Sequence, residues 1–149
     1  MKIYFAGDHA GFEFKKDLIA FVKSLGHEVE DMGPFTYDPQ DDYPDFVIPL
    51  AKKVAASPDA RGILTAASGQ GEVVAANRIQ GVRAVVYYGG TLDVVYKTRE
   101  HNDANILSVG ARFAGFQEAK EAVRIFLETK FSNEERHVRR LAKIDQASL

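Results

Sequence analysis

The chain alternates short apolar runs, rich in β-branched and aromatic residues, with segments whose apolar residues recur at helical spacing. This alternation restricts the fold more than any other feature. Strands are predicted at Lys2–Ala6, Gly62–Thr65, Val82–Tyr87 and Asn105–Val109, with a weaker strand near His27–Glu30. Helices that separate strands in this way are typical crossovers of a parallel sheet. We therefore expect an α/β fold with a five-stranded parallel sheet flanked by helices.

The segments between the strands contain two clear amphipathic helices. The apolar faces consist of Phe14, Leu18, Phe21, Val22 and Leu25 in the first, which ends at Gly26, and of Ala119, Ala122, Val123, Phe126 and Leu127 in the second. After Thr129 the chain becomes basic, and we expect one further helix at its C-terminal end. The segment Asp31–Asp45 contains one glycine and three prolines among acidic residues, which predicts a long surface loop.

The stretch from Gly62 to Asn77 combines a predicted strand, a Ser/Gly turn and the start of a helix. Gly69 and Gly71 allow the backbone to approach a ligand closely, and the first amides of the helix favour an anion. Glu72 would then lie beside that ligand. A tight structural turn is the competing interpretation, and the Lys-Ser/Thr ending of a Walker A loop is absent.

Ligands of open parallel α/β sheets bind at the carboxyl ends of the strands. Three polar segments follow predicted strands: Gly7–Gly11, the Ser68 turn and Gly110–Arg112. We expect these segments to converge on one edge of the sheet.

Each candidate also has a purely structural interpretation. Asp8 is a favoured helix cap, and Glu72 suits the start of a helix whether or not it is catalytic. The segment Arg99–Asn105 is compatible with a solvated helix end. Arg136 and Arg140 lie four residues apart and could clamp a phosphate from one helix face, or belong to an ordinary basic helix; His137 points to another face.

Composition limits the possible functions. The length of 149 residues fits one domain spanning residues 1–149, and 46% hydrophobic with 27% charged residues is ordinary globular usage. The net charge of −2 argues against a general nucleic-acid binder, and the sequence predicts neither a signal peptide nor a membrane span. The absence of cysteine excludes disulfides, thiolate metal sites and cysteine nucleophiles. We expect a cytoplasmic protein whose chemistry uses His, Asp, Glu, Ser or Arg.

Taken together, the motifs resemble the type B ribose-5-phosphate isomerase and galactose-6-phosphate isomerase family, over nearly the whole chain. The matching segments are Gly7-Asp8-His9-Ala10-Gly11-Phe12, Asp42-Tyr43-Pro44-Asp45, Gly62-Ile63-Leu64, Ser68-Gly69-Gln70-Gly71, Ala75-Ala76-Asn77, Arg99-Glu100-His101-Asn102-Asp103-Ala104-Asn105, Gly110-Ala111-Arg112 and Arg136-His137-Val138-Arg139-Arg140. The order and number of these segments make the resemblance specific. The resemblance implies a single three-layer, Rossmann-like (flavodoxin-like) domain, which agrees with the predicted parallel sheet.

The resemblance implies aldose-ketose isomerisation of a phosphorylated sugar through an enediolate, without metal or organic cofactor. Some members use a cysteine at the position of Ala66, whereas another branch has a glutamate at the position of Glu72, which is therefore the expected base. Ser68, with the amides at Gly69 and Gly71, would stabilise the enediolate oxygen. By the same analogy His101 would help to open the sugar ring.

The remaining roles implied by the resemblance concern binding. Asp8, counted with the catalytic residues, would lie within hydrogen-bonding reach of the sugar hydroxyls, which Asn102 would orient. Tyr43, Gly69 and Gly71 are further substrate-binding residues, and those assigned to the phosphate are His9, Arg112, Arg136 and Arg140. The family forms dimers whose sites combine both subunits, so we expect a homodimer, with a tetramer as the larger alternative, and residues of one chain could complete different sites.

Two departures from the family leave the sugar open. The resemblance favours conversion of ribose 5-phosphate to ribulose 5-phosphate. The segments 31–42 and 84–93 differ from the usual pattern, so galactose 6-phosphate and a tetrulose phosphate remain alternative substrates. A non-catalytic sugar-phosphate sensor is the alternative of a different class. Glu72 favours the enzyme, because a binding protein has no use for a base against C2.

Overall fold

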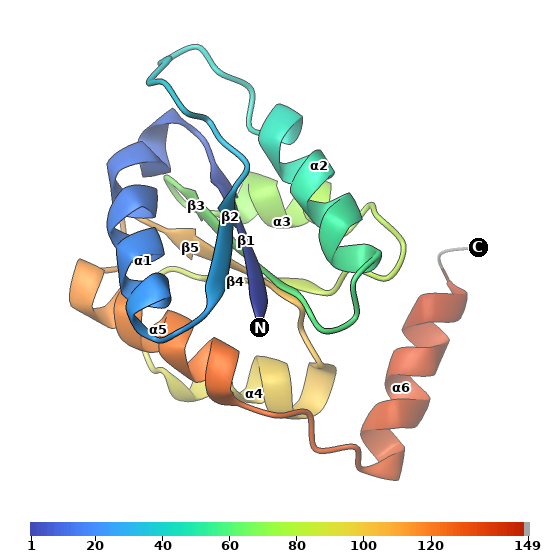
Figure 1. Ribbon diagram of the computed structural model, residues 1–149. Helices are drawn as coiled ribbons and strands as arrows, with labels where there is room; N and C mark the ends of the chain where they lie inside the picture. Colours follow the sequence, from blue (N-terminus) through green and yellow to red (C-terminus); the bar gives the residue numbers. More distant parts are fainter. Residues whose placement is uncertain (148–149) are drawn as a thin grey trace.

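The centre of the molecule is a five-stranded parallel sheet in the order β2-β1-β3-β5-β4 (Figure 1). This computed structural model describes residues 1–147. The strands are β1 (Lys2–Gly7), β2 (Glu28–Asp31), β3 (Arg61–Ala66), β4 (Ala84–Tyr87) and β5 (Ile106–Gly110). All four neighbouring pairs are parallel, so the predicted sheet is confirmed.

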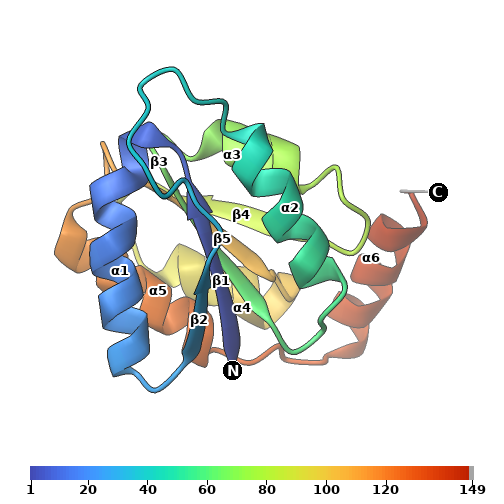
Figure 2. The ribbon, with the colours of Figure 1, turned by 45° about the horizontal axis from the view of Figure 1, so that its top comes forward.

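Helices cover both faces of the sheet and give three layers. They are α1 (Phe12–Ser24), α2 (Pro44–Ala55), α3 (Gln70–Ala76), α4 (Asp93–Asn102), α5 (Phe116–Glu128) and α6 (Glu135–Gln146), with a short 3-10 turn at His9–Gly11. Helices α1, α4 and α5 pack on one face, and α2 and α3 pack on the other (Figure 2). Helix α6 stands apart from these layers in both views and contacts α4.

Alternate residues of the strands supply the two halves of the core. In β1, Ile3 and Phe5 face α1 and α5, whereas Ala6 faces α2; in β3, Ile63 and Leu64 divide in the same way. A parallel strand that is covered on both faces needs apolar residues at successive positions. This requirement explains the continuous apolar runs in the sequence.

The loop between β2 and α2 is shorter than expected at both ends, because Asp31 is the last residue of β2. Pro44 is the first residue of α2, so Pro44 and Asp45 belong to the helix rather than to the loop. Proline is favoured there because its fixed φ suits the first helical turn and the helix does not need its missing N–H. Within residues 1–147, each helix is too short or too polar to cross a membrane.

Candidate functional site

The predicted site begins at the edge where the parallel strands end. β1, β3 and β5 are neighbours in the sheet, and Gly7, Ala66 and Gly110 are their last residues. The amide of Ala111 donates to the carbonyl of Ala66 at 2.7 Å, and the amide of Arg112 donates to the carbonyl of Ala67 at 3.0 Å. The predicted convergence of the three polar segments on one edge is therefore observed.

The turn between β3 and α3 is held in a conformation that requires glycine. Gly69 has φ of +78°, and a Cβ there would lie 2.7 Å from Oγ of Ser108, which donates a hydrogen bond to the carbonyl of Gly69. At Gly71 a Cβ would lie 2.7 Å from the hydroxyl oxygen of Tyr43. The two glycines thus let Tyr43 and β5 approach the turn that carries Ser68.

Glu72 lies in the first turn of α3 and is only 4% exposed. Burial raises the pKa of this carboxyl, and the negative charge of Asp8 adds to the increase, while a backbone hydrogen bond opposes it. A carboxyl with a raised pKa holds a proton more readily at neutral pH than an ordinary glutamate does. This property suits a group that must accept a proton and then return it.

Asp8 is buried next to the end of β3. Its Oδ1 accepts hydrogen bonds from the amides of Ala10 and Gly11 at 2.9 and 3.2 Å, so Asp8 caps the 3-10 turn. It does not cap α1 itself, as the sequence predicted, because Gly11 occupies the N-cap position of that helix. A Cβ on Gly11 would lie 2.3 Å from the carbonyl oxygen of Thr65, which shows how closely this turn packs against β3. Asp8 therefore acts as a cap and also contributes negative charge close to Glu72.

His9 is held by a carboxylate from a distant part of the chain. Its Nδ1 lies 2.6 Å from Oδ1 of Asp41, and this hydrogen bond is the main reason that the pKa of His9 is raised. Arg112 lies near enough for its positive charge to oppose the increase. The strand-end edge thus carries a histidine and an exposed arginine beside a buried carboxyl group.

The structure divides the twelve predicted site residues into two groups. The first group gathers at the carboxyl ends of the strands: Asp8, His9, Tyr43, Ser68, Gly69, Gly71, Glu72 and Arg112. The second group belongs to the end of α4 and to α6: His101, Asn102, Arg136 and Arg140. Helix α4 ends just before β5 begins, and parallel strands begin at the edge of the sheet opposite to their carboxyl ends. This second group therefore lies toward the edge opposite to the first group.

The second group contacts different partners. The His101 ring stacks on that of His137 with centroids 4.4 Å apart, and Nδ1 of His137 donates to the carbonyl of His101 at 3.1 Å. Asn102 lines a cavity of about 320 Å³ between α6 and the segment that precedes β4. Arg136 and Arg140 are exposed on α6. The sequence analysis set His137 aside because it lies on another helix face than Arg136. Its contact with His101, 36 residues earlier, joins α6 to α4 and could not be read from local spacing.

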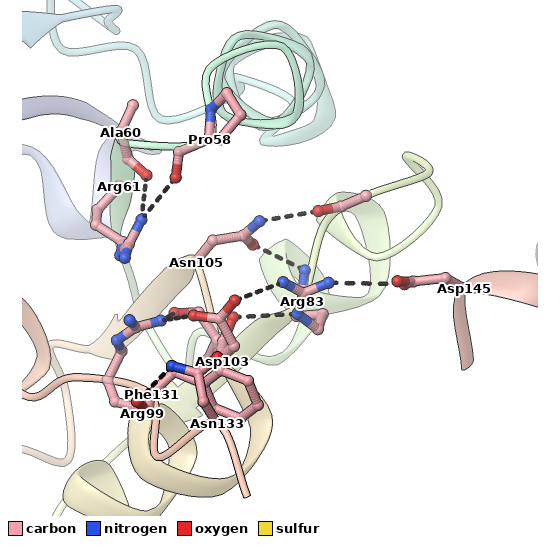
Figure 3. Close-up of polar contacts among 12 residues, drawn as sticks. Pro58, Ala60, Arg61, Arg83, Arg99, Asp103, Asn105, Phe131, Asn133 and Asp145 are labelled. Atoms are coloured by element: carbon pink, nitrogen blue, oxygen red, sulfur yellow. Dashed lines mark hydrogen bonds and ion pairs between the residues drawn. The ribbon is translucent and has the colours of Figure 1, made fainter. Parts of the chain in front are cut away.

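A network of charged groups holds the end of α4 (Figure 3). Asp103 has φ of 44° and accepts from Arg99 at 2.8 Å through one oxygen and from Arg83 at 3.0 Å through the other. Arg83 also lies 3.6 Å from Asp145 of α6. Sequence reasoning treated Asp103 as an ordinary turn residue, although it joins the segments before β4 and β5.

A family model described as ribose/galactose isomerase matches residues 3–144 of the chain. Among curated proteins, ribose-5-phosphate isomerase B of Mycolicibacterium paratuberculosis is 40% identical over 141 residues, which cover 95% of this chain and 87% of that protein. A putative sugar phosphate isomerase of Bacillus subtilis is 37% identical over 144 residues, which cover 97% of this chain and 95% of that protein.

Two solved structures of ribose-5-phosphate isomerases of type B are similar to this chain over almost its whole length. The crystal structure of ribose-5-phosphate isomerase B from Mycoplasma genitalium, with bound ribulose-5-phosphate, superposes with a TM-score of 0.93 at 35% identity and covers 98% of this chain and 95% of that one. The type B enzyme of Trypanosoma cruzi also gives 0.93, at 38% identity, with 99% of this chain and 98% of that one covered.

Proposed function

The chain belongs to the ribose/galactose isomerase family, and we propose that it interconverts ribose 5-phosphate and ribulose 5-phosphate. The observation that carries this proposal is the buried carboxyl of Glu72, with its raised pKa, in the turn that also presents Ser68. A related protein with the same fold holds ribulose-5-phosphate in its crystal structure, which supports the choice of a pentose phosphate.

We assign Glu72 as the base of the isomerisation. In its ionised form it takes the proton from C2 of the open-chain aldose, and the electrons form an enediolate across C1 and C2. Returning the proton to C1, with transfer of the hydroxyl proton from O2 to O1, gives the ketose, so no atoms are gained or lost. Ser68 and the amides at Gly69 and Gly71 supply the hydrogen bonds that stabilise the developing negative charge.

The binding residues divide between two parts of the proposed site. We assign His9 and Arg112 to the phosphate, and Asp8 and Tyr43 to the sugar end, all from the strand-end edge of one chain. Since the second group lies toward the opposite edge of the sheet, we propose that His101, Asn102, Arg136 and Arg140 complete the site of another copy in a homodimer. A tetramer could arise by pairing of such dimers.

Assays with ribose 5-phosphate, galactose 6-phosphate and a tetrulose phosphate, side by side, would test the proposed function. We expect turnover of ribose 5-phosphate by the purified protein. We also expect Glu72→Gln to reduce kcat by about 10²- to 10⁴-fold, the usual contribution of a general base, while binding of the sugar phosphate persists.

Glu13→Gln is the matched control, because Glu13 is exposed on α1 and pairs only with Lys16 among the described residues. This variant should keep the wild-type rate. Turnover of galactose 6-phosphate or the tetrulose phosphate alone would correct the substrate. Binding without turnover of any of the three sugars would instead favour the sensor, and a near wild-type rate for Glu72→Gln would contradict the assignment of the base.

A further inference from the structure

The loop between β2 and α2, residues 32–43, lies over the first strand-end turn and is firmly attached at its start. Lys15 of α1 is buried and donates to Oδ1 of Asp31 at 2.7 Å and to the carbonyl of Pro34 at 2.8 Å. The amide of Gly7 donates to the carbonyl of Gly33 at 3.1 Å. These contacts connect the loop directly to the end of β1.

The end of the same loop carries Asp41, whose side chain is only 6% exposed. Its Oδ1 lies 2.6 Å from Nδ1 of His9, 32 residues earlier in the chain. Its Oδ2 is buried and has no hydrogen-bond partner among residues 1–147. A buried carboxylate that serves stability alone normally has both oxygens satisfied. Within residues 1–147, the hydrogen bond of the Asp41 side chain is made to His9.

Aromatic residues complete the setting of His9. The ring of Tyr37, from the same loop, meets the His9 ring edge to face with centroids 6.3 Å apart, and it meets the ring of Phe12 in the same way at 6.1 Å. Since Nδ1 is used by Asp41, the ring has one nitrogen left for a ligand, Nε2. The side chain of His9 remains 29% exposed, so a ligand has access to it.

We propose that Asp41 is a positioning residue that fixes the His9 imidazole through Nδ1 and leaves Nε2 to bind the phosphate group of the substrate. The assignment of His9 to the phosphate rests on the proposed function. The role of Asp41 does not follow from the motifs of the family, because the loop that carries it is one of the two segments that depart from them.

The charges around His9 give the direction of the expected pH dependence. Asp41 and Asp8 raise the pKa of His9, whereas Arg112 lowers it, and the hydrogen bond to Asp41 is the largest contribution. A protonated imidazole binds a phosphate dianion through a charge-assisted hydrogen bond. Removing the charge of Asp41 lowers the pKa of His9, so phosphate binding is lost at lower pH than in the wild type.

Kinetics of Asp41→Asn and Asp41→Ala between pH 6 and 8 test the proposal. At pH 8 we expect KM for ribose 5-phosphate to rise about tenfold, the equivalent of one charge-assisted hydrogen bond, with kcat within about twofold of wild type. The increase for Asp41→Asn should shrink toward pH 6, because its amide oxygen still accepts from Nδ1 and a larger fraction of His9 is protonated in both proteins at lower pH. Asp38→Asn is the control: Asp38 is exposed in the same loop and its Oδ1 accepts from the amide of Gln40, so KM should not change.

A second measurement needs no turnover. Ring ¹⁵N shifts of His9 followed by NMR during titration with inorganic phosphate should show weaker binding in Asp41→Asn than in wild type and Asp38→Asn. Equal phosphate affinity in the three proteins would overturn the proposal, as would a loss of kcat with unchanged KM. If the wild type turned over none of the three sugars yet Asp41→Asn still weakened phosphate binding, the proposed function would fail while the role of Asp41 would stand.

Discussion

At the scale of single residues, the environment that suits Glu72 for proton transfer also costs stability. Between the ordinary pKa of glutamate and the raised pKa of Glu72, the folded protein binds more protons than the unfolded chain. The free energy of unfolding therefore falls as pH rises through this interval. We expect Glu72→Gln to be more stable than wild type at pH 8, and the difference to shrink toward pH 4, where the carboxyl is mostly protonated in both states.

Thermal unfolding of the two proteins from pH 4 to pH 8 measures this effect. Glu13→Gln provides the reference, because it makes the same chemical change at an exposed position on α1. A stability difference between Glu72→Gln and wild type that did not vary with pH would show that burial does not perturb the ionisation of Glu72.

Local sequence pattern revealed some of these residues and not others. Ser68, Gly69 and Glu72 belong to one strand-turn-helix segment, so their proximity follows from the local chain path. The contact of His9 with Asp41 could not be predicted, because no local periodicity relates two loops 32 residues apart. The resemblance named His101 and Arg140, but placing them relative to Glu72 required the topology of the sheet.

At the scale of elements, Asp103 joins the end of α4 to the neighbouring segments. Arg99 is buried, and Arg83 is mostly so; each donates to a different oxygen of Asp103. Asp103→Asn keeps the shape and the tolerance for positive φ but removes the negative charge that both arginines contact. We expect the free energy of unfolding to fall by about 2 kcal/mol, as measured by urea denaturation.

Glu135→Gln serves as a comparison at this scale. It removes an exposed i,i+4 ion pair with Arg139 on α6, an interaction that contributes little in water. The urea midpoint of this variant should equal that of wild type. If Asp103→Asn were equally unaffected, the network at the end of α4 would have no role in stability.

The order of the elements was largely predictable, whereas several of their ends were not. Short apolar runs identified β1, β3 and β5, and apolar residues at helical spacing identified α1 and α5, since each element buries such a run or stripe. The start of α2 was missed because Pro44 marks both loops and first helical turns. The sequence did not indicate that α6 stands apart from the layers. Its apolar face around Leu141 would suit a helix packed on the sheet equally well.

At the scale of the whole molecule, the two groups of site residues lie toward opposite edges of one sheet. β3 has six residues, and a strand of that length spans about 20 Å. One sugar phosphate is too short to contact residues at both ends of such a strand. Helix α6 also leaves Val138 and Ile144 exposed, so it has apolar surface available for a second copy. A site shared between two copies would bring the groups together.

Hybrid dimers provide a direct test of that arrangement. Glu72→Gln and His101→Ala chains would be co-expressed with different affinity tags, and dimers that carry both tags would be purified. If His101 serves the partner's site, one of the two sites in each hybrid has both residues intact, and about half of the wild-type activity should return. If His101 served its own chain, both sites would carry one defect and the hybrid would stay inactive. Pairing Glu72→Gln with the Glu72→Gln/His101→Ala double variant leaves neither site with Glu72, so recovery there would instead indicate exchange with wild-type enzyme.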